Sequence, residues 1–496
     1  MIRISDKIIR KQHNFWNNCI FHPTDAVEDP WGRRILDRMS ADRSIDTVRI
    51  YSMFEDIVYL GEEGEIRYDF RLSDMRLDYL VERGYNVLLS YAGMPDCIAS
   101  SDSAKTVMAK KRSRYKGKFW NSMPPKDYKL WEDVCYEYTK HIIERYGIET
   151  VSKWYIHCYN EPDMGGFWLS NLPKDAWEAR FDAYCPLYES FQRAIRRIDP
   201  DNRLSIGGPA LANSYAFLRK FLNFVKENSL RIDYVALHNY GTYPEFLLRG
   251  ESRLEVENNI KHHLNYLDII KESGLRDLKI VIDEWGMSSH GYLNAEDCPP
   301  FITRENEVFA AYYTKLVKRL IDVDPNITKL MICLSGQHEM TEDFSGFRNF
   351  FTLNHFAKPI YNAHLMASRL GTLLLSAEVE DENIALVPTK TEDGEYSVML
   401  SYSSKYFEED IKSYTEKLAF DEDLSGRRLT VFCIDKEHTN PYRLAQKLGA
   451  IHNPDDEQKR ILREEGKLKP VLDAIYDGNP IELELTANCT YLIRII

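Results

Sequence analysis

The chain has 496 residues, more than a single hydrophobic core usually supports, so at least two domains are expected. Hydrophobic residues make up 44% of the sequence and charged residues 28%, which is the balance of a soluble globular protein. The net charge of −13 argues against nucleic acid as a partner, because a phosphate backbone attracts proteins with an excess of lysine and arginine.

The nine cysteines are dispersed without C-x-x-C spacing, which favours reduced thiols in a cytosolic protein over a disulfide framework. The first residues, MIRISDKIIRKQHNFW, contain no apolar signal-peptide region, although a chain trimmed of its leader would look the same. No stretch approaches the roughly 18 apolar residues of a membrane span. The sequence therefore predicts a cytoplasmic protein with no membrane partner, and it leaves the oligomeric state open.

Short apolar segments alternate with helical patterns through the first three quarters of the chain. The clearest helical pattern lies in 126–146, where Leu130, Val134, Tyr138 and Ile142 fall on one face. Eightfold alternation of strand and helix is typical of an α/β fold, the (β/α)8 TIM barrel. A doubly wound sheet is the alternative, but no G-x-G-x-x-G opens the first strand–helix turn. The expected barrel strands are 15–20, 46–51, 86–92, 153–159, 203–209, 234–240, 280–285 and 329–335.

The pattern changes after the eighth expected helix, 358–371, which should end at Gly371. Short strand-like segments follow, interrupted by a charged helical insert at 455–465. The sequence therefore predicts a catalytic barrel over 14–371 and an appended C-terminal β-sandwich domain built from 1–13 and 372–496. No flexible linker separates the two, so we expect them to pack tightly. The expected strands of the second region are 383–390, 396–404, 427–435, 480–487 and 490–496.

Two glutamates stand at the ends of expected barrel strands. Glu161, in WYIHCYNEPD, follows the fourth strand, and Glu284, in LKIVIDEWGM, ends the seventh. The active site of such a barrel lies at the carboxyl ends of its strands, and strands four and seven nearly face each other. A lone glutamate is more often an ordinary ion-paired residue. Two buried carboxylates that face a pocket, however, are the pair of catalytic groups that a glycosidase uses. Retention of configuration requires the two carboxyl groups to lie about 5 Å apart.

Longer motifs surround these glutamates, among them PPKDYKLWEDV (124–134) and HIIERYGIETVSKWYIHCYNEPDMGGFW (141–168). Further motifs lie in 195–210, 358–371 and 434–454. In all of them the chain resembles glycoside hydrolase family thirty-nine, the family of β-xylosidases and α-L-iduronidases. The resemblance implies a retaining exo-glycosidase that takes an oligosaccharide or small glycoside and uses no cofactor and no metal. It implies Glu161 as acid/base and Glu284 as nucleophile.

The resemblance also implies substrate-binding residues beside the glutamates. Asn160 would hydrogen bond the sugar 2-hydroxyl, and Tyr240 would hold the nucleophile ionised and aimed. His238 shares a strand end with Tyr240, in ALHNYG. For these three residues the alternatives are turn formation and core packing.

Aromatic residues follow both glutamates. Trp285 comes directly after one of them, and Phe167 and Trp168 come shortly after the other. Their rings can serve as walls on which a sugar stacks, although aromatic side chains in barrel loops more often pack in the core.

Several strand ends depart from the family's pattern, at 50–57, 90–96, 283–286 and 333–340. The reaction class is unaffected, but the identity of the sugar is not defined by these positions. We expect a neutral β-linked pentose released from a chain end.

Other substrates and modes of action remain alternatives. A uronide would need a cation for its carboxylate, which Arg49 or Arg348 would supply. An arabinoside, endo action on a polysaccharide, and a non-catalytic carbohydrate-binding relative are further possibilities. The loops at 93–125 and 286–303 are long enough to wall off a pit, which would favour exo action.

Overall fold

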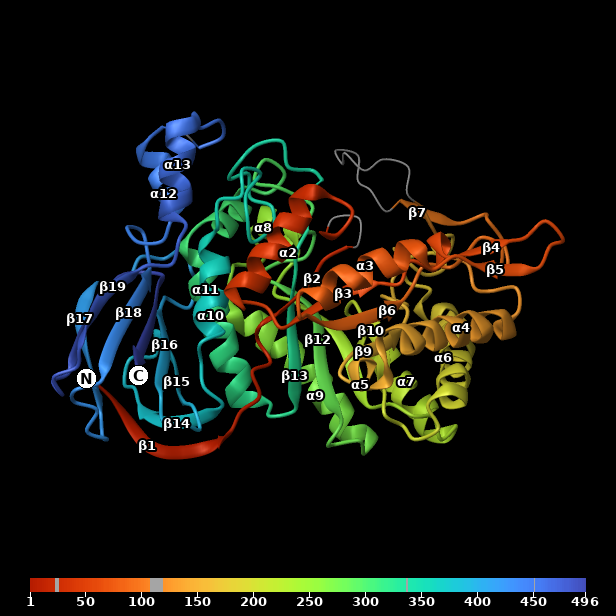
Figure 1. Cartoon of the computed structure of the whole chain (residues 1–496), viewed down its shortest axis with the longest axis horizontal. Coiled ribbons are helices and arrows are strands. Elements are labelled where there is room, and N and C mark those ends of the chain that lie inside the picture. Colours follow the sequence, from red (N-terminus) through yellow and green to blue (C-terminus); the bar gives the residue numbers. More distant parts are fainter. Residues whose placement is uncertain (23–25, 108–118, 336–337, 450) are drawn as a thin grey trace.

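The computed structural model describes residues 1–22, 26–107, 119–335, 338–449 and 451–496. At its centre lies a closed barrel of parallel strands in the order β2, β3, β6, β9, β10, β11, β12 and β13 (Figure 1). The predicted (β/α)8 barrel is therefore confirmed. The strands are β2 (Asn18–Ile20), β3 (Thr47–Tyr51), β6 (Asn86–Tyr91), β9 (Tyr155–Cys158), β10 (Ser205–Leu211), β11 (Tyr234–Tyr240), β12 (Lys279–Gly286) and β13 (Ile327–Cys333).

The barrel strands are buried on both faces, which explains their nearly continuous apolar sequences. Their outward side chains join the large core beneath the helices. Their inward side chains fill the barrel, so its middle is a packed core and not a channel. This inner layer contains Leu88, Ala210, Tyr234, Ala236, Val281 and Met331.

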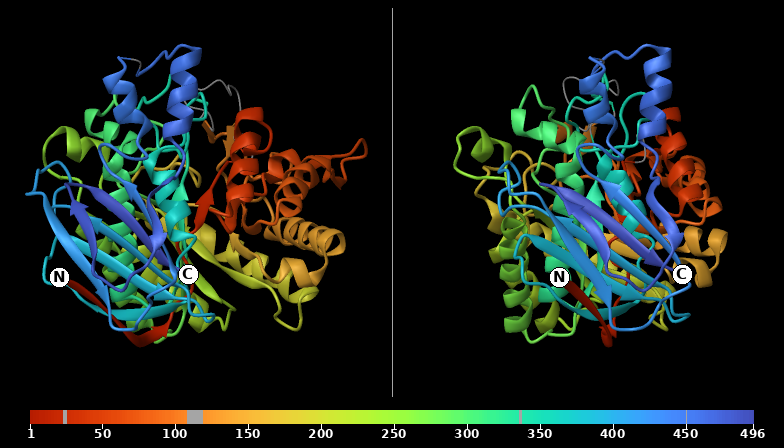
Figure 2. Two further views of the ribbon diagram at one scale, coloured as in Figure 1. Left: turned by 60° about the vertical axis from the view of Figure 1, so that its left-hand side comes forward. Right: turned by 90° about the vertical axis from the view of Figure 1, so that its left-hand side faces the viewer.

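Helices surround the barrel (Figure 2). The first of them was not predicted, yet it has a clear start signal: the Asp29 side chain accepts from the Trp31 amide, and Pro30 occupies the first turn. The principal helices are α2 (Pro30–Asp42), α3 (Arg71–Glu82), α4 (Tyr128–Tyr146), α6 (Trp177–Ile198), α7 (Tyr215–Glu227), α9 (Val256–Ser273), α10 (Glu307–Val323) and α11 (Pro359–Ala367).

Gly371 does not end the last barrel helix, because α11 already stops at Ala367. A Cβ atom at position 371 would lie 2.4 Å from the Lys390 carbonyl oxygen, and the Gly371 amide donates to Thr389 Oγ1 at 2.9 Å. The glycine therefore permits a close approach between the end of the barrel and the following sheet.

Short elements decorate the connections around the barrel. These elements are β4 (Val58–Leu60), β5 (Ile66–Tyr68), β7 (Lys105–Val107), β8 (Phe119–Asn121), α5 (Ile148–Val151), α8 (Pro244–Leu248), η1 (Phe54–Asp56) and η2 (Pro299–Glu305). Four of them are strands that form two antiparallel pairs, β4 with β5 after β3 and β7 with β8 after β6.

The C-terminal region forms one nine-stranded mixed sheet in the order β19, β18, β21, β16, β15, β14, β1, β17 and β20. The N-terminal strand β1 joins it by pairing with β14 and β17, as predicted for the first residues. The strands are β1 (Ile2–Lys11), β14 (Leu373–Glu378), β15 (Ile384–Lys390), β16 (Tyr396–Tyr402), β17 (Tyr414–Phe420), β18 (Arg428–Ile434), β19 (Pro470–Ile475), β20 (Ile481–Leu485) and β21 (Cys489–Ile495).

This sheet curls so that its two halves share one core, as in a sandwich. Leu418 of β17 and Leu483 of β20 belong to the same buried cluster as Val398 of β16 and Ile493 of β21. A second set of sheet residues, including Met399, belongs to the core of the barrel. The sheet and the barrel are thus packed against each other, whereas the domain boundaries at 13/14 and 371/372 stay a prediction.

Two helices, α12 (Pro441–Lys447) and α13 (Asp456–Glu465), stand beyond the sheet (Figures 1 and 2). Tyr442 and Leu462 from this pair pack against Phe344 and Phe356 of the connection after β13. The insert therefore supports a loop at the carboxyl end of the barrel.

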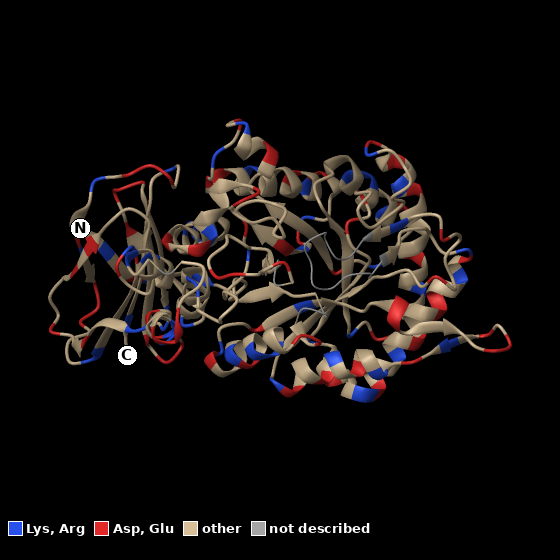
Figure 3. Cartoon of the chain, turned by 90° about the horizontal axis from the view of Figure 1, so that it is seen from above, with Lys and Arg blue, Asp and Glu red and all other residues tan. Residues whose placement is uncertain are grey.

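Acidic and basic residues are interspersed along the outer helices of the barrel (Figure 3). In the described part of the chain, every helix is too short or too polar to cross a lipid bilayer.

Candidate active site

Glu161 and Glu284 meet at the carboxyl end of the barrel. Glu161 follows β9 by three residues, and Glu284 lies near the end of β12. One carboxylate oxygen of each residue lies within 4.8 Å of the other. Both side chains line a pocket of about 390 Å³.

Each of the eight barrel strands, or the connection that follows it, contributes described residues to the wall of this pocket. Thr106 comes from the connection after β6, and Ser289 to Tyr292 come from the connection after β12. These are the two loops expected to wall off a pit, although 108–118 of the first loop lies outside the described residues. Described residues from every strand end of the barrel therefore surround the pocket. Other lining residues include Ile20, Tyr51, Phe167, Ala212, Tyr240, Tyr243, Cys333 and Arg348.

Glu284 is surrounded by groups that favour its ionised form. Arg49 Nη1 donates to Oε1 at 2.8 Å, and the Tyr240 hydroxyl donates to Oε2 at 2.6 Å. Burial by itself raises the pKa of Glu284, but the charges of His238 and Arg49 and the Tyr240 hydrogen bond outweigh it, so the pKa is lowered. The Glu284 carboxylate is therefore held ionised, with one oxygen accepting from Arg49 and the other from Tyr240.

The Glu161 backbone has an uncommon conformation. Its φ angle is 45°, in the left-handed region that most residues avoid, and its amide donates to the Ala210 carbonyl at 2.9 Å. Two residues on, the Asp163 carboxylate accepts from the amides of Ala212, Asn213 and Ser214, each at 3.0 Å. These contacts tie the connection after β9 to the one after β10 and fix the strained backbone that presents Glu161.

Glu161 contacts His238, whose Nδ1 lies 2.9 Å from Oε1. Burial raises the pKa of Glu161, and the neighbouring charges of Glu284 and Asp163 raise it further, against the opposing influence of His238. The pKa of His238 is itself raised well above its usual value: burial lowers it, but Glu284, Asp283 and the Glu161 contact outweigh that effect. The two glutamates are thus driven to opposite protonation states.

Arg49 occupies the centre of the cluster beneath the pocket. Besides Glu284, it contacts Asn160, whose Oδ1 accepts from Nη2 at 2.6 Å, and Asp283 Oδ2 at 3.3 Å. The Asn160 amide nitrogen has no hydrogen-bond partner among the described residues. A buried donor of this kind is costly unless a ligand accepts from it. Arg49 is fully committed to protein partners, so the idea that it receives a uronate carboxylate is wrong.

The predicted aromatic walls are only partly present. Trp285 is completely buried and stacks on Tyr313 with a ring-centroid distance of 5.8 Å, so the prediction that it contacts a sugar is wrong. Its side chain alternates with Glu284 along the strand and therefore points toward the helices. Trp168 is likewise buried, against Tyr159. Phe167, in contrast, lines the pocket.

His238 also differs from its predicted place. It is fully buried and is not among the lining residues, so it contacts Glu161 and not a substrate directly. Two residues with important contacts were not singled out from the sequence: Tyr51, whose hydroxyl lies 3.4 Å from Glu284 Oε1, and Asp283. The signal for Asp283 was the adjacent pair of acids in an otherwise apolar strand.

Arg348 forms part of the pocket wall. Its guanidinium donates to the carbonyl oxygens of Cys333, at 2.5 Å, and Ser288, at 2.6 Å, and lies 3.4 Å from the Tyr240 hydroxyl. Within the described ranges, no carboxylate forms an ion pair with it. A buried guanidinium without a carboxylate is unusual and marks this wall as the one suited to an anionic group.

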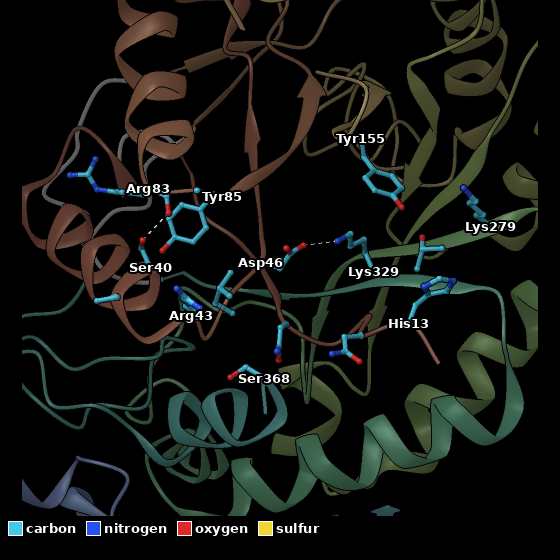
Figure 4. A pocket seen from close by; sticks show the side chains of 16 residues that line it. His13, Ser40, Arg43, Asp46, Arg83, Tyr85, Tyr155, Lys279, Lys329 and Ser368 are labelled. Carbon is cyan, nitrogen blue, oxygen red and sulfur yellow. Dashed lines mark hydrogen bonds and ion pairs between the residues drawn. The ribbon is translucent and has the colours of Figure 1, made fainter. Parts of the chain in front are cut away.

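A larger hollow, of about 990 Å³, lies at the opposite end of the barrel (Figure 4). Its lining includes residues at the starts of strands, such as Tyr155, Lys279 and Lys329. Lys329 forms an ion pair with Asp46 at 3.0 Å, and the Ser40 hydroxyl donates to the Arg83 carbonyl at 2.8 Å (Figure 4). The amino ends of barrel strands serve stability, so this hollow is not the candidate active site.

A group of side chains in the C-terminal sheet, Cys433, Asp435 and His438, lies close enough together to hold a metal ion. Asp435 already accepts from the Cys433 thiol at 3.3 Å and from the backbone amides of Glu437 and His438 at 2.7 Å. These contacts are those of a tight turn after β18. None of these residues lines the pocket at the glutamates.

Comparisons with known proteins agree with this architecture. The model of Glycosyl hydrolases family 39 matches residues 1–476. A β-xylosidase of Caldicellulosiruptor saccharolyticus is 24% identical over 493 residues, covering 97% of this chain and 94% of that protein. A solved β-xylosidase of Caulobacter crescentus matches with a TM-score of 0.82 and 19% identity, covering 100% of this chain and 99% of that one. A bacterial orthologue of human α-L-iduronidase matches with a TM-score of 0.77 and 17% identity, covering 100% of this chain and 83% of that one.

Proposed function

Because this chain belongs to glycosyl hydrolase family 39 and is a glycoside hydrolase, we propose that it acts with retention of configuration through Glu161 and Glu284. The approach of their oxygens to within 4.8 Å carries this proposal. Retaining enzymes hold the two carboxyl groups about 5 to 5.5 Å apart, whereas inverting enzymes need about 6.5 to 9.5 Å to admit a water. The spacing leaves room for direct attack on the sugar.

Glu161 acts as acid and then as base. In the first step its proton passes to the glycosidic oxygen while a Glu284 oxygen attacks the anomeric carbon, and the bond to the leaving alcohol breaks. In the second step a water attacks the same carbon, gives its proton to Glu161, and releases Glu284 from the ester. The opposite pKa shifts of the two residues support this assignment, since the cycle starts with one protonated and one ionised carboxyl group.

Asn160 completes the catalytic centre. Asn160 is buried and does not itself line the pocket, but its Oδ1 accepts from Arg49, which leaves the amide nitrogen free to donate to a bound sugar. A hydrogen bond from this nitrogen to the 2-hydroxyl would strengthen as positive charge develops on the sugar ring. Arg49 therefore aligns the nucleophile and Asn160 together.

Replacement of Tyr240 by phenylalanine should lower kcat about 10- to 100-fold, because a hydrogen bond to a charged group contributes roughly 1.5 to 3 kcal/mol. Loss of the donor at 2.6 Å also raises the pKa of Glu284, so the acidic limb of the pH–rate profile should move to higher pH. The profile of kcat/KM for both proteins tests this. A variant with an unchanged acidic limb would show that Tyr240 does not hold the nucleophile.

The favoured substrate is a β-xyloside cleaved from a chain end. Its support is the β-xylosidase relatives together with the pocket, which residues from all eight strand ends surround, as expected for exo action. A uronide is the second candidate, because Arg348 offers the pocket a guanidinium with no carboxylate partner among the described residues. The two candidates share the mechanism and differ in one wall of the pocket.

A panel of nitrophenyl glycosides tests the substrate. We expect kcat/KM for the β-D-xyloside to exceed that for α-L-iduronides, β-glucuronides and arabinosides by at least about tenfold, which corresponds to about 1.4 kcal/mol of transition-state binding. A preference for a uronide would replace the first candidate by the second. Absence of hydrolysis of every member would contradict both.

A further inference from the structure

Asp283 is a buried carboxylate that the proposed mechanism does not use. It is completely shielded from solvent and directly precedes Glu284. Neither of its side-chain oxygens accepts a hydrogen bond of normal geometry from the described residues. A buried carboxylate is costly unless opposite charges offset it, so its neighbours should indicate what it does.

One oxygen of Asp283 faces three nitrogen-bearing side chains. Oδ2 lies 3.3 Å from Arg49 Nη2, 3.7 Å from His157 Nδ1 and 3.8 Å from His238 Nε2. Burial and the Arg49 charge lower the pKa of His157 to about 3, so this ring is neutral, and its Nε2 contacts Ser90 at 2.6 Å. Arg49 and His238 are left as the cations of the cluster.

His238 lies between Asp283 and Glu161. Its Nε2 lies 3.8 Å from Asp283 Oδ2 and has no hydrogen-bond partner among the described residues, while its Nδ1 lies 2.9 Å from Glu161 Oε1. Arg49 contacts both Glu284 and Asp283, so its single positive charge cannot offset both carboxylates. A protonated His238 supplies the second positive charge. Arg49 and His238 then offset the charges of Asp283 and Glu284, and Glu161 is a neutral acid.

On the basis of the proposed function, we propose that Asp283 is a positioning residue that acts on Glu161 through His238. Its negative charge keeps the imidazole of His238 protonated on both nitrogens. The Nδ1–H donates to Glu161 Oε1, which leaves the acidic proton on Oε2, free to be directed at the glycosidic oxygen. After that proton has moved, the same imidazolium stabilises the Glu161 carboxylate.

We call Asp283, His238 and Glu161 the triad. Apart from Glu284 and Asp163, the other titratable groups around the triad carry no negative charge that could keep His238 protonated in place of Asp283. Burial raises the pKa of the neighbouring tyrosines and of Cys333, and lowers the pKa of His262 to about 4, so these groups are neutral near pH 7. The groups that face the triad are Arg49 and Tyr51 on β3, His157 on β9, Asp163 after β9, Tyr234 and Tyr240 on β11, Tyr243 after β11, His262 on α9, Glu284 on β12 and Cys333 on β13.

Asp283→Asn tests the inference through the pH dependence of kcat/KM on a glycoside with a poor leaving group. Removal of the negative charge reduces the proton affinity of the His238–Glu161 pair, whichever residue holds the proton. The basic limb should therefore move to lower pH by about one unit or more, and the acidic limb should move in the same direction as Glu284 loses its anionic neighbour. Lower activity with both limbs unmoved would overturn the proposal.

Asp324→Asn is the matched control. Asp324 is also buried, and its carboxylate lies 2.8 Å from His263 Nε2, but neither residue lines the pocket or contacts Glu161, His238 or Glu284. The control should lose stability and keep the wild-type pH profile. A shift in both variants would mean that removal of any buried aspartate disturbs the profile, which would overturn the specific role of Asp283.

A measurement on the unaltered protein gives a second test that does not depend on turnover or on folding of the Asp283 variant. Histidine labelled with ¹³C in the ring is followed by NMR, and the His238 signal is identified by its loss in His238→Gln. We expect an imidazolium signal at pH 7. A neutral His238 would overturn the proposal, whereas failure of every glycoside substrate would instead contradict the proposed function.

Discussion

Glu284→Ala should abolish turnover of every glycoside, with a loss of at least about 10⁴-fold in kcat, because no other described group can form the covalent intermediate. Arg49 and Tyr240 would remain with no carboxylate to hold. Added azide should restore turnover of a substrate with a good leaving group by entering the vacated space, and the glycosyl azide should have the inverted configuration. Substrate kinetics and NMR of the azide product measure the two effects.

Glu307→Gln provides the control for the loss at Glu284. Glu307 is also buried, but its carboxylate contacts Arg443 at 2.6 Å and Asn440 at 2.8 Å at the junction with α12. This variant should lose stability and retain kcat. If folded Glu284→Ala lost much less than about 10⁴-fold in kcat without azide, the nucleophile would have been assigned wrongly.

Glu161→Ala should affect substrates according to their leaving group. With a poor leaving group the loss should be about 10²- to 10⁴-fold, the usual contribution of general acid catalysis, and it should be much smaller with dinitrophenolate, which departs without a proton. Azide should restore the second step and give a glycosyl azide of retained configuration, because it attacks from the side that Glu161 occupied. A plot of rate against leaving-group pKa for both proteins makes the comparison.

Glu132→Gln serves as the corresponding control. Glu132 is largely buried and paired with Arg193 at 2.8 Å and Arg197 at 2.9 Å on the outer helices. The rate of Glu132→Gln should depend on the leaving-group pKa in the same way as the rate of the wild-type protein. An equal loss on all leaving groups in Glu161→Ala would exclude Glu161 as the acid.

The barrel could be predicted from the sequence because its strands are buried on both faces and read as apolar runs. The C-terminal sheet was harder to delimit. All six residues of β19, PVLDAI, are exposed, and its apolar residues do not alternate with polar ones as they do in a half-buried strand, so it was not predicted. β17 was missed for a related reason, since its sequence YTEKLAF mixes charged residues into a strand with only one fully buried position.

The surroundings of the two glutamates were less accessible to sequence reasoning than the glutamates themselves. Strand alternation predicts that Asp283 and Glu284 point to opposite faces. In the structure, Leu237 pairs with Ile282 and His238 with Glu284, so the register shifts at Asp283 and both carboxylates reach the interior cluster. Such a bulge re-aims side chains beside an active site, and the short-range pattern did not indicate it.

The aromatic residues show the same limit. The alternation that directs Glu284 inward sends Trp285 outward into the helical layer, while Tyr51 reaches the pocket from β3. The identity of both rings was plain in the sequence, but which one faces the pocket depends on strand register.

The stereochemistry of the first product tests the two-glutamate account most directly. Hydrolysis of a β-xyloside, or of the best substrate from the panel, is followed by ¹H NMR from the earliest time points, before the sugar anomers interconvert. The account predicts that the product first appears with the anomeric configuration of the substrate, so that β-xylose precedes α-xylose. Initial release of the α anomer would mean that water attacks directly, and would contradict the roles proposed for Glu161 and Glu284.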